Sequence, residues 1–293
     1  MRRIIFKISY IVILIVFSIY VILDTFVIEK SETAVEKIVS SITEPQEMIF
    51  TDDYYQDENI TIKISTINEY DTQIYIADVQ ISSIDFLKTA FANDTYGRNI
   101  KQTTSEIASN NDAILAINGD YYGFRDYGYV LRNGTIYRNK KNSSSSQEDL
   151  VIYSDGSFQI VNESTSNIEQ LLKNGALQVF SFGPALIKNG EISVNTNSEV
   201  AQSMASNPRT AIGIIDELHY VFVVSDGRTS ESEGLSLYEL ATVMKQLGCK
   251  VAYNLDGGGS STMYFNGKVV NNPTTNGKSS KERSVSDIVY IGY

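Results

Sequence analysis

The first part of the chain is dominated by one long apolar stretch. Between Ile8 and Leu23 no charged side chain interrupts a run of Ile, Val, Leu and Phe, and Lys7 stands directly before it. A helix of sixteen residues spans about 24 Å. The residues before Lys7 lengthen it toward the ~30 Å of a hydrocarbon core if the lysine ammonium reaches the headgroups. The pattern predicts a membrane-spanning helix over residues 1–23.

The charges around this stretch predict its orientation. Arg2, Arg3 and Lys7 precede the apolar run, so the positive-inside rule leaves the N-terminus in the cytoplasm and the chain after Asp24 outside the cell. A cleaved secretory signal is the alternative, but residues 23–27 lack the small-residue site that signal cleavage requires. We therefore expect an uncleaved, single-pass anchor in the cell membrane.

A polar segment separates the apolar stretch from the rest of the chain. Residues 24–59 are acidic and show little apolar periodicity, which predicts a stalk, partly helical between Ser31 and Ser40. From Ile60 the pattern changes, because Ile60, Ile62 and Ile64 alternate with polar residues as in a half-buried strand. We therefore expect a folded domain over residues 60–293.

Within this domain the pattern predicts many strands and few helices. Three Asn-Gly pairs, at 133–134, 189–190 and 266–267, mark hairpin turns. A capping box at Ser236 and Glu239 opens a helix that Gly248 ends, and weaker helices are predicted over residues 104–110 and 167–173. Further strands are predicted over residues 74–81, 113–118, 151–153, 185–187, 211–215, 219–225, 251–255, 262–265 and 286–291. These elements indicate a single α+β domain with a mixed sheet, preceded by a transmembrane helix and a polar stalk.

The composition of the chain excludes several classes of partner and of catalytic site. The chain has 24 basic and 35 acidic residues and a formal net charge of -11, which argues against a nucleic-acid partner. A single cysteine excludes an intramolecular disulfide and a multi-cysteine metal cage, and a single histidine, His219, excludes histidine-rich zinc sets within one chain. His219 lies in an apolar strand pattern, so we expect a structural role for it. Catalysis must therefore rest on carboxylates, arginines, hydroxyls and backbone groups.

Three predicted strands end in a turn that carries an aspartate. They place Asp120, Asp226 and Asp256 at strand ends, where a sheet can hold functional groups in fixed positions. Asp-Gly is also ordinary turn chemistry, and we interpret Asp155-Gly156 in that way. The run Gly257, Gly258, Gly259 and Ser260 is longer than a turn needs, because glycine lets backbone amides approach an anionic ligand.

Arginines stand at three further junctions of strands and turns. Arg209, Arg228 and Arg283 could together form a phosphate pocket, because a guanidinium matches a phosphate bidentately, although scattered surface ion pairs are an equal explanation. Neither of the common nucleotide-binding glycine motifs and no Ser-centred nucleophile elbow is present.

Six blocks of residues occur in the order seen in a known family: AINGDYYG at 116–123, FGP at 182–184, PRTAIG at 208–213, DGR at 226–228, NLDGGGSS at 254–261 and RSVSD at 283–287. The resemblance, which covers roughly residues 60–293, is to the phosphodiester glycosidase family. It implies an enzyme that hydrolyses a sugar-1-phosphodiester on the sugar side and releases a free, N-acetylglucosamine-like sugar. Bacterial relatives are associated with exopolysaccharide metabolism in the cell envelope.

The chemistry of this reaction suggests roles for the candidate residues. A departing phosphate needs neutralisation, and an oxocarbenium-like carbon needs a carboxylate. Arg209, Arg228 or Arg283 and the amides of residues 257–260 would hold the phosphate. Asn118 and Tyr121 would contact the sugar, unless they only complete the strand. The nucleophile or base would be one of Asp120, Asp226 and Asp256, with Glu282 a weaker candidate acid or base.

Two alternatives stay open at this point. A metal-dependent phosphodiesterase would cut the P–O bond, because clustered aspartates can hold Ca²⁺ or Mg²⁺; otherwise no cofactor or metal is expected. A non-catalytic envelope module that binds an anionic glycan fits the anchor equally well. The expected partners are the membrane and a cell-surface glycan or sugar phosphodiester, and the sequence does not indicate an oligomeric state.

Overall fold

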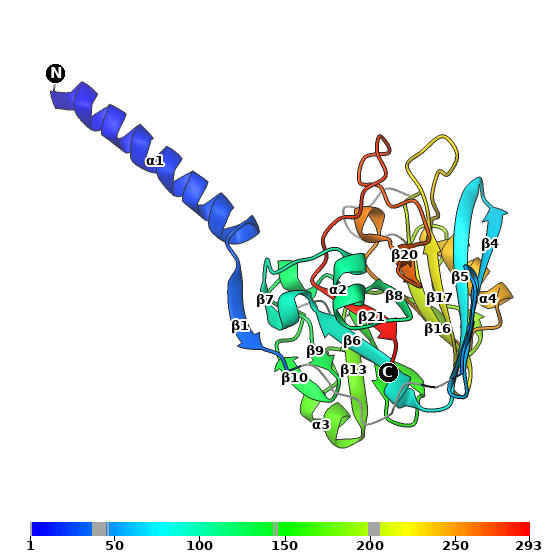
Figure 1. Ribbon diagram of the computed structural model, residues 1–293. Helices are drawn as coiled ribbons and strands as arrows, with labels where there is room; N and C mark the ends of the chain where they lie inside the picture. Colours follow the sequence, from blue (N-terminus) through cyan, green and yellow to red (C-terminus); the bar gives the residue numbers. More distant parts are fainter. Residues whose placement is uncertain (1, 37–44, 46, 143, 145, 199–205) are drawn as a thin grey trace.

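The N-terminal helix projects away from the folded part of the chain. The computed structural model describes residues 2–36, 45, 47–142, 144, 146–198 and 206–293. Helix α1 (Arg2–Phe26) extends to one side of a body made mostly of strands (Figure 1). Its segment Lys7–Phe26 has a mean hydropathy of 2.3, and none of its residues is buried in the body. By length and composition this helix can cross a membrane.

The largest element is a nine-stranded sheet in which every pair of neighbours is antiparallel. Its strands, from one edge to the other, are β15 (Glu191–Ile192), β14 (Ala185–Lys188), β18 (Val251–Asn254), β16 (Thr210–Asp216), β17 (His219–Ser225), β5 (Thr72–Ile81), β4 (Ile60–Glu69), β3 (Tyr54–Gln56) and β2 (Ile49–Phe50).

Two five-stranded antiparallel sheets and one two-stranded sheet complete the body. The first has the order β10 (Thr135–Arg138), β9 (Val130–Arg132), β13 (Ala176–Phe180), β11 (Glu148–Tyr153) and β12 (Phe158–Asn162). The second has the order β20 (Lys268–Val269), β19 (Met263–Phe265), β8 (Leu115–Asn118), β21 (Asp287–Ile291) and β6 (Leu87–Phe91). The smallest pairs β1 (Lys30–Ala34) with β7 (Thr95–Arg98).

The three larger sheets share one hydrophobic core. Alternate residues of β17, among them Tyr220 and Phe222, point into this core, while Val221 and Val223 point to the opposite face. The same core receives Ile117 from β8 and Leu150 from β11. Because side chains alternate along a strand, each sheet has a second face that must be covered.

Three short helices cover these outer faces. Helix α4 (Leu237–Gln246) packs on the nine-stranded sheet, α2 (Thr104–Asn110) on β8 and β21, and α3 (Ile168–Lys173) on β13. In the part of the chain that the structure describes, four single-turn 3₁₀ helices lie in the connections: η1 (Ile84–Phe86), η2 (Ala92–Asp94), η3 (Tyr122–Phe124) and η4 (Gly258–Ser260).

The structure confirms the α+β fold with few helices. The three Asn-Gly pairs form the β9–β10, β14–β15 and β19–β20 turns, with both residues at positive φ as a type I′ turn requires. Helices α2 and α4 each begin with a complete capping box, and Asn167 caps α3. The predicted mixed sheet differs from the structure, where every strand pair among the described residues is antiparallel.

The segment predicted as a stalk contributes to the sheets. The predicted helix between Ser31 and Ser40 is wrong where the residues are described, because Lys30–Ala34 forms β1, and residues 37–40 lie outside the described part. Strands β2 and β3 extend the edge of the nine-stranded sheet beyond β4. The domain boundary at residue 60 stays a prediction, and the residues before it already pair with the body.

The capping box of α4 gives a first test. Ser236 Oγ accepts a hydrogen bond from Glu239 N (3.2 Å), so Ser236→Ala leaves that amide without its partner. We expect a loss of about 1 kcal/mol in the free energy of unfolding, measured by urea denaturation. Ser230→Ala, in an exposed turn, is the control. Equal midpoints for the two variants would contradict the assignment of the cap.

Candidate active site

The candidate site lies where the ends of strands from two sheets meet. The end of β17 and the end of β18 lie beside the start of β16, because Thr210 pairs with Val224 and Ala211 with Asn254. In the second sheet the end of β8 lies beside the start of β21. Asn118, at the end of β8, connects these two groups of strand ends, since its Nδ2 donates to the backbone oxygen of Asp256 (2.6 Å).

An open cleft of about 590 Å³ occupies this junction. Five arginines and two aspartates line it, so its charged side chains sum to a positive charge in a chain that is strongly acidic overall. The cleft is lined by Arg98, Tyr121, Phe124, Arg125, Asp126, Tyr127, Phe182, Asn207, Arg209, Arg228, Asn254, Leu255, Asp256, Gly257, Gly258 and Arg283. A concave surface of this size and charge suits a small anionic ligand.

Asp256 is the predicted carboxylate that reaches the cleft. Its Oδ2 accepts hydrogen bonds from Ser260 Oγ (2.6 Å) and Arg283 Nη2 (3.1 Å), and its Oδ1 accepts from Gly257 N (3.0 Å). Burial raises the pKa of this carboxyl group, while the Arg283 charge and the hydrogen bonds act in the opposite direction. The carboxylate is therefore held in one orientation and remains 13% exposed to the cleft.

All three predicted arginines line the cleft. The Arg228 guanidinium donates to Asn207 Oδ1 from Nε (3.1 Å) and Nη2 (2.9 Å) and to Thr275 O from Nη1 (2.6 Å). Arg209 is almost fully buried and donates from Nε to Leu235 O (2.8 Å). The Arg283 side chain is 41% exposed, which makes it more accessible to a ligand than Arg209.

Two further arginines in the cleft were not predicted. Arg98 ends β7, and Arg125 follows η3, where its Nη2 donates to Ser181 O (2.5 Å). Their Nε atoms are buried and have no hydrogen-bond partner among the described residues. The sequence signal for Arg125 was its place two residues after the AINGDYYG block, whereas Arg98 stands in no motif.

An aromatic pair borders the cleft. The Tyr121 and Phe124 rings stack with centroids 4.8 Å apart and planes inclined by 23°, and Tyr121 is 37% exposed. Such a surface can support a sugar ring, and the sugar contact expected of Tyr121 stays a prediction. Asn118 is placed differently: it is fully buried, and its Oδ1 accepts hydrogen bonds from Thr210 Oγ1 and Thr262 N. It connects strands and does not line the cleft.

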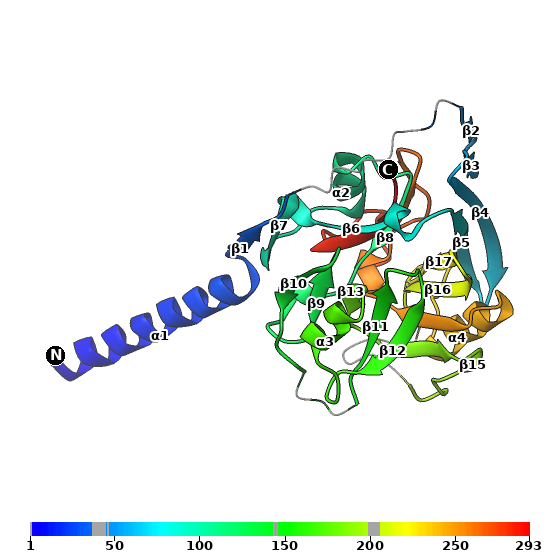
Figure 2. The ribbon, with the colours of Figure 1, turned by 90° about the horizontal axis from the view of Figure 1, so that it is seen from below.

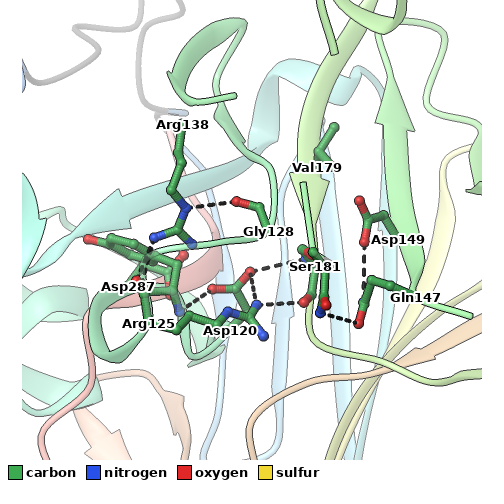
Figure 3. A network of polar contacts seen from close by, with 12 residues as sticks. Asp120, Arg125, Gly128, Arg138, Gln147, Asp149, Val179, Ser181 and Asp287 are labelled. Atoms are coloured by element: carbon green, nitrogen blue, oxygen red, sulfur yellow. Dashed lines mark hydrogen bonds and ion pairs between the residues drawn. The ribbon is translucent and has the colours of Figure 1, made fainter. Parts of the chain in front are cut away.

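Asp120 belongs to a buried ion network beneath the cleft. Its carboxylate lies 3.3 Å from Arg132 Nη2 and 3.9 Å from Arg125 Nη2, and accepts hydrogen bonds from the amides of Tyr122 and Ser181. Burial opposes its charge, but the arginines lower its pKa below the usual value. Figure 3 shows Asp120 between Arg125 and Ser181. Asp120 therefore supports Arg125 from below rather than lining the cleft.

The same network contains Asp287 and Arg132. Arg132 donates to Asp287 Oδ2 from Nε (2.9 Å) and Nη2 (2.8 Å), and neither side chain is more than 1% exposed. Gly119 is required beside this pair, because a Cβ atom there would lie 2.3 Å from Asp287 Oδ1. The motif Asn118-Gly119-Asp120 is therefore used to join the sheets.

Asp226 and Glu282 also have structural partners. Asp226 is almost fully buried and accepts hydrogen bonds from Asn272 N (2.8 Å), Asn271 Nδ2 (3.2 Å) and Tyr75 Oη (3.2 Å). Glu282 accepts from the backbone amide and the hydroxyl of Ser105 at the start of α2. Neither carboxylate lines the cleft.

The glycine run at residues 257–260 shapes the cleft, but most of its backbone amides donate hydrogen bonds to other groups of the protein. Gly258 N donates to Pro208 O (2.8 Å), Ser260 N to Gly257 O (3.3 Å) and Gly257 N to the Asp256 side chain. Gly258 has a positive φ, and a Cβ atom there would lie 2.8 Å from Arg228 Nη2. Gly259 and Ser260 are buried and do not line the cleft. The loop therefore fixes the position of Asp256 and leaves room for the Arg228 side chain. The arginines supply the cationic hydrogen-bond donors.

Within the described ranges, no group of three or more His, Cys, Asp or Glu side chains is arranged to hold a metal ion. The three aspartates of the metal hypothesis lie in separate hydrogen-bond networks. His219 lies outside the cleft, with its Nε2 3.0 Å from Asp78 Oδ1.

Comparison with known proteins identifies the family. Residues 111–292 match the family described as phosphodiester glycosidase. The chain belongs to this family of hydrolases. An uncharacterized SPbeta prophage-derived protein of Bacillus subtilis, YomE, is 26% identical over 272 residues, which cover 89% of this chain and 41% of YomE. Human N-acetylglucosamine-1-phosphodiester alpha-N-acetylglucosaminidase is 30% identical over 189 residues, 59% of this chain and 36% of the human protein. The chain thus spans less than half the length of these relatives.

Two solved structures show the same fold. The catalytic domain of the zebrafish N-acetylglucosamine-1-phosphodiester alpha-N-acetylglucosaminidase, described as auto-inhibited by its pro-peptide, aligns with a TM-score of 0.63 at 20% identity. That alignment covers 91% of this chain and 89% of the zebrafish chain. A hypothetical protein from Synechocystis aligns with a TM-score of 0.55 at 16% identity, covering 80% of this chain and 62% of its own.

A buried acid pair next to the network gives a prediction about pH. Asp149 and Glu163 are both fully buried, and Ser181 Oγ donates to Glu163 Oε2 (2.9 Å). Burial, and then the Glu163 charge, raises the pKa of Asp149 well above its usual value. The folded protein therefore binds a proton that the unfolded chain releases above about pH 3.9, so stability falls as the pH rises through the raised pKa.

Asp149→Asn removes this proton uptake. We expect the urea midpoint of the variant to depend less on pH than that of the wild type, with the relative gain in stability largest on the alkaline side. A residual slope of the same sign should remain, because burial also raises the pKa of Asp287 to about 7. Glu217→Gln, on an exposed turn, is the control and should keep the wild-type slope. Parallel pH profiles for Asp149→Asn and the wild type would refute this assignment.

Proposed function

We propose that this protein hydrolyses a sugar-1-phosphodiester on the sugar side, releases a free N-acetylglucosamine-like sugar, and leaves the phosphate on the other partner. The observation that carries the proposal is the cleft in which one fixed carboxylate, Asp256, stands among five arginines. The human relative is named for action on an N-acetylglucosamine-1-phosphodiester, which supports the choice of sugar.

The residues of the cleft divide the chemistry between them. The arginines neutralise the phosphate, whose departure as a stable anion needs little protonation. Asp256 acts at the anomeric carbon, either as nucleophile or as the base that activates water. The stacked Tyr121 and Phe124 rings offer an apolar surface to the sugar ring. Asp120 acts through Arg125 and is a positioning residue.

We further propose that α1 is an uncleaved anchor, that the N-terminus is cytoplasmic and that the cleft lies outside the cell, where the enzyme acts on cell-surface polysaccharide. The absence of a small-residue site between residues 23 and 27 supports an anchor over a cleaved signal.

Product identity tests the reaction. The full chain in detergent is incubated with a panel of sugar-1-phosphodiesters, and the products are identified by mass. A free sugar and a phosphomonoester are expected. A sugar phosphate, formed only without EDTA, would show that the protein is a metal-dependent phosphodiesterase, and binding without turnover of any panel member would indicate a glycan-binding module.

Asp256→Asn tests the assigned carboxylate. We expect kcat to fall by about 10²–10⁴-fold, the usual contribution of a positioned acid–base or nucleophilic carboxylate. Asp126→Asn is the matched control: this second cleft aspartate is paired with Lys140 on the surface, and its loss should leave kcat within a few-fold. A greater loss from Asp126→Asn than from Asp256→Asn would reverse the assignment.

The pH profile tests the same carboxylate independently. Because burial raises the pKa of Asp256, protonation should remove activity as the pH falls, and the acidic limb of kcat/KM should lie above the usual range of an aspartate. Steady-state rates across a pH series measure this limb. A profile that stays flat down to pH values near 4 would mean that an aspartate with an ordinary pKa, or no carboxylate, controls the rate.

A further inference from the structure

The membrane helix is attached to the wall of the cleft. Asn99 is 1% exposed, and its Nδ2 donates to the backbone oxygens of Thr25 (3.2 Å) and Ile28 (2.9 Å) at the end of α1. A helix end leaves carbonyl groups that need donors, and here the folded body supplies them. The helix therefore meets the body directly at its last turn.

Strand β1 strengthens this attachment. Lys30 pairs with Arg98 in the β1–β7 sheet, and its Nζ lies 2.7 Å from Asp24 Oδ2, so one residue binds both the helix end and the body. The approach is close, because a Cβ atom on Gly97 would lie 2.1 Å from Lys30 O. Val35 then packs on the cluster that contains Phe91. The residues after α1 thus hold the body at the helix end, where a stalk would have separated the two.

The same piece of chain forms one wall of the cleft. Arg98 lines the cleft, and Asn99, which holds the helix, is the next residue, so their Cα atoms are about 3.8 Å apart. The amide of Asn99 donates to Gly123 O in η3 (3.0 Å), and Tyr121 and Phe124 on either side of Gly123 also line the cleft. Both ribbon views show α1 leaving the body on the side of β7 (Figures 1 and 2).

We infer that the cleft opens next to the membrane surface and that its substrate is a sugar phosphodiester anchored in the bilayer. This inference rests on the proposed function and on α1 as the anchor. Tyr127 lines the cleft and is 40% exposed, and tyrosines of this kind settle at the membrane interface. Lys101, exposed two residues after Asn99, can face anionic headgroups.

The proposed hydrolysis at the membrane surface forms one bond to the anomeric carbon and breaks another. Water adds its hydroxyl group to the anomeric carbon, the bond from that carbon to the bridging oxygen breaks, and the phosphate keeps that oxygen and its electron pair. The remaining proton of water goes to the phosphate or to solvent. The sugar leaves in solution, and the lipid phosphomonoester stays in the membrane.

The geometry is tested without reference to activity. The full chain is reconstituted in vesicles of phosphatidylcholine and phosphatidylglycerol, with a fluorophore on Tyr127→Cys or, as matched control, on Tyr238→Cys. Tyr238 is 39% exposed on α4, on the side of the body away from α1 (Figure 1), and the native Cys249 is buried and should not react. A lipid carrying a nitroxide on its headgroup should quench the label at 127 several-fold more than the label at 238. Equal quenching at both positions would overturn the membrane-facing cleft.

The substrate class is tested in the same vesicles. N-acetylglucosamine 1-phosphate is esterified either to a long-chain alcohol, inserted in the enzyme's own or in separate vesicles, or to a short alcohol in solution. Sharing a membrane raises the effective concentration, so turnover of the lipid ester in the shared vesicle should exceed that in separate vesicles by about 10-fold or more.

The lipid ester should also have a higher kcat/KM than the soluble ester at equal bulk concentration. Equal values would overturn the anchored substrate while leaving the proposed hydrolysis intact. Cleavage of neither ester, together with stronger quenching at 127, would overturn the substrate class through failure of the proposed function and leave the membrane-facing geometry standing.

Discussion

The site depends on the buried ion pairs that the Arg132 guanidinium forms with Asp120 and Asp287. Arg132 lies on β9 and binds Asp287 at the start of β21 and Asp120 just beyond β8, so one side chain joins two sheets. It also lies 4.2 Å from the centre of the Phe180 ring and donates to the backbone oxygens of Leu131 and Val179. Removing one partner of such a buried set leaves an uncompensated charge, which typically costs about 3–5 kcal/mol.

This network reaches the cleft through Asp120. The Asp120 carboxylate forms ion pairs with both Arg132, which is fully buried, and Arg125, which lines the cleft. Arg125 also donates to the backbone oxygen of Ser181, and the Ser181 amide donates back to Asp120. Arg125 is therefore fixed before a ligand arrives, and preorganised charge is what stabilises a developing anion most effectively.

The sequence was most informative where local chemistry decides structure. Asn-Gly turns and capping boxes act within a few residues, so hairpins and helices could be placed without knowledge of the fold. Strands β1 and β7 could not, because β1 is polar and exposed and is stabilised by pairing rather than by burial. The family was also recognisable, since its blocks contain the residues that join the sheets.

The roles of the aspartates could not be predicted in the same way. Asp120, Asp226 and Asp256 each follow a strand and precede or lie near glycine, so all three look alike in sequence. Which one faces a ligand depends on distant partners: Arg132 covers Asp120, and Asn271 with Asn272 covers Asp226. Arg98 and Arg125 enter the cleft for the complementary reason, because the pairing of β1 with β7 and the Asp120 network hold them there.

One consequence is that the proposed anchor and the proposed catalytic cleft are physically linked. The Asp120 loop continues into η3, η3 binds the Asn99 amide, and Asn99 holds the end of α1. A displacement of the helix end would therefore act on Arg98 and on the Tyr121–Phe124 pair before it acted on Asp256, which is held from the opposite side by Ser260 and Arg283. The wall of the cleft that we assign to the sugar and the membrane is thus connected to α1, while the carboxylate that we assign to the chemistry is fixed to the sheet core.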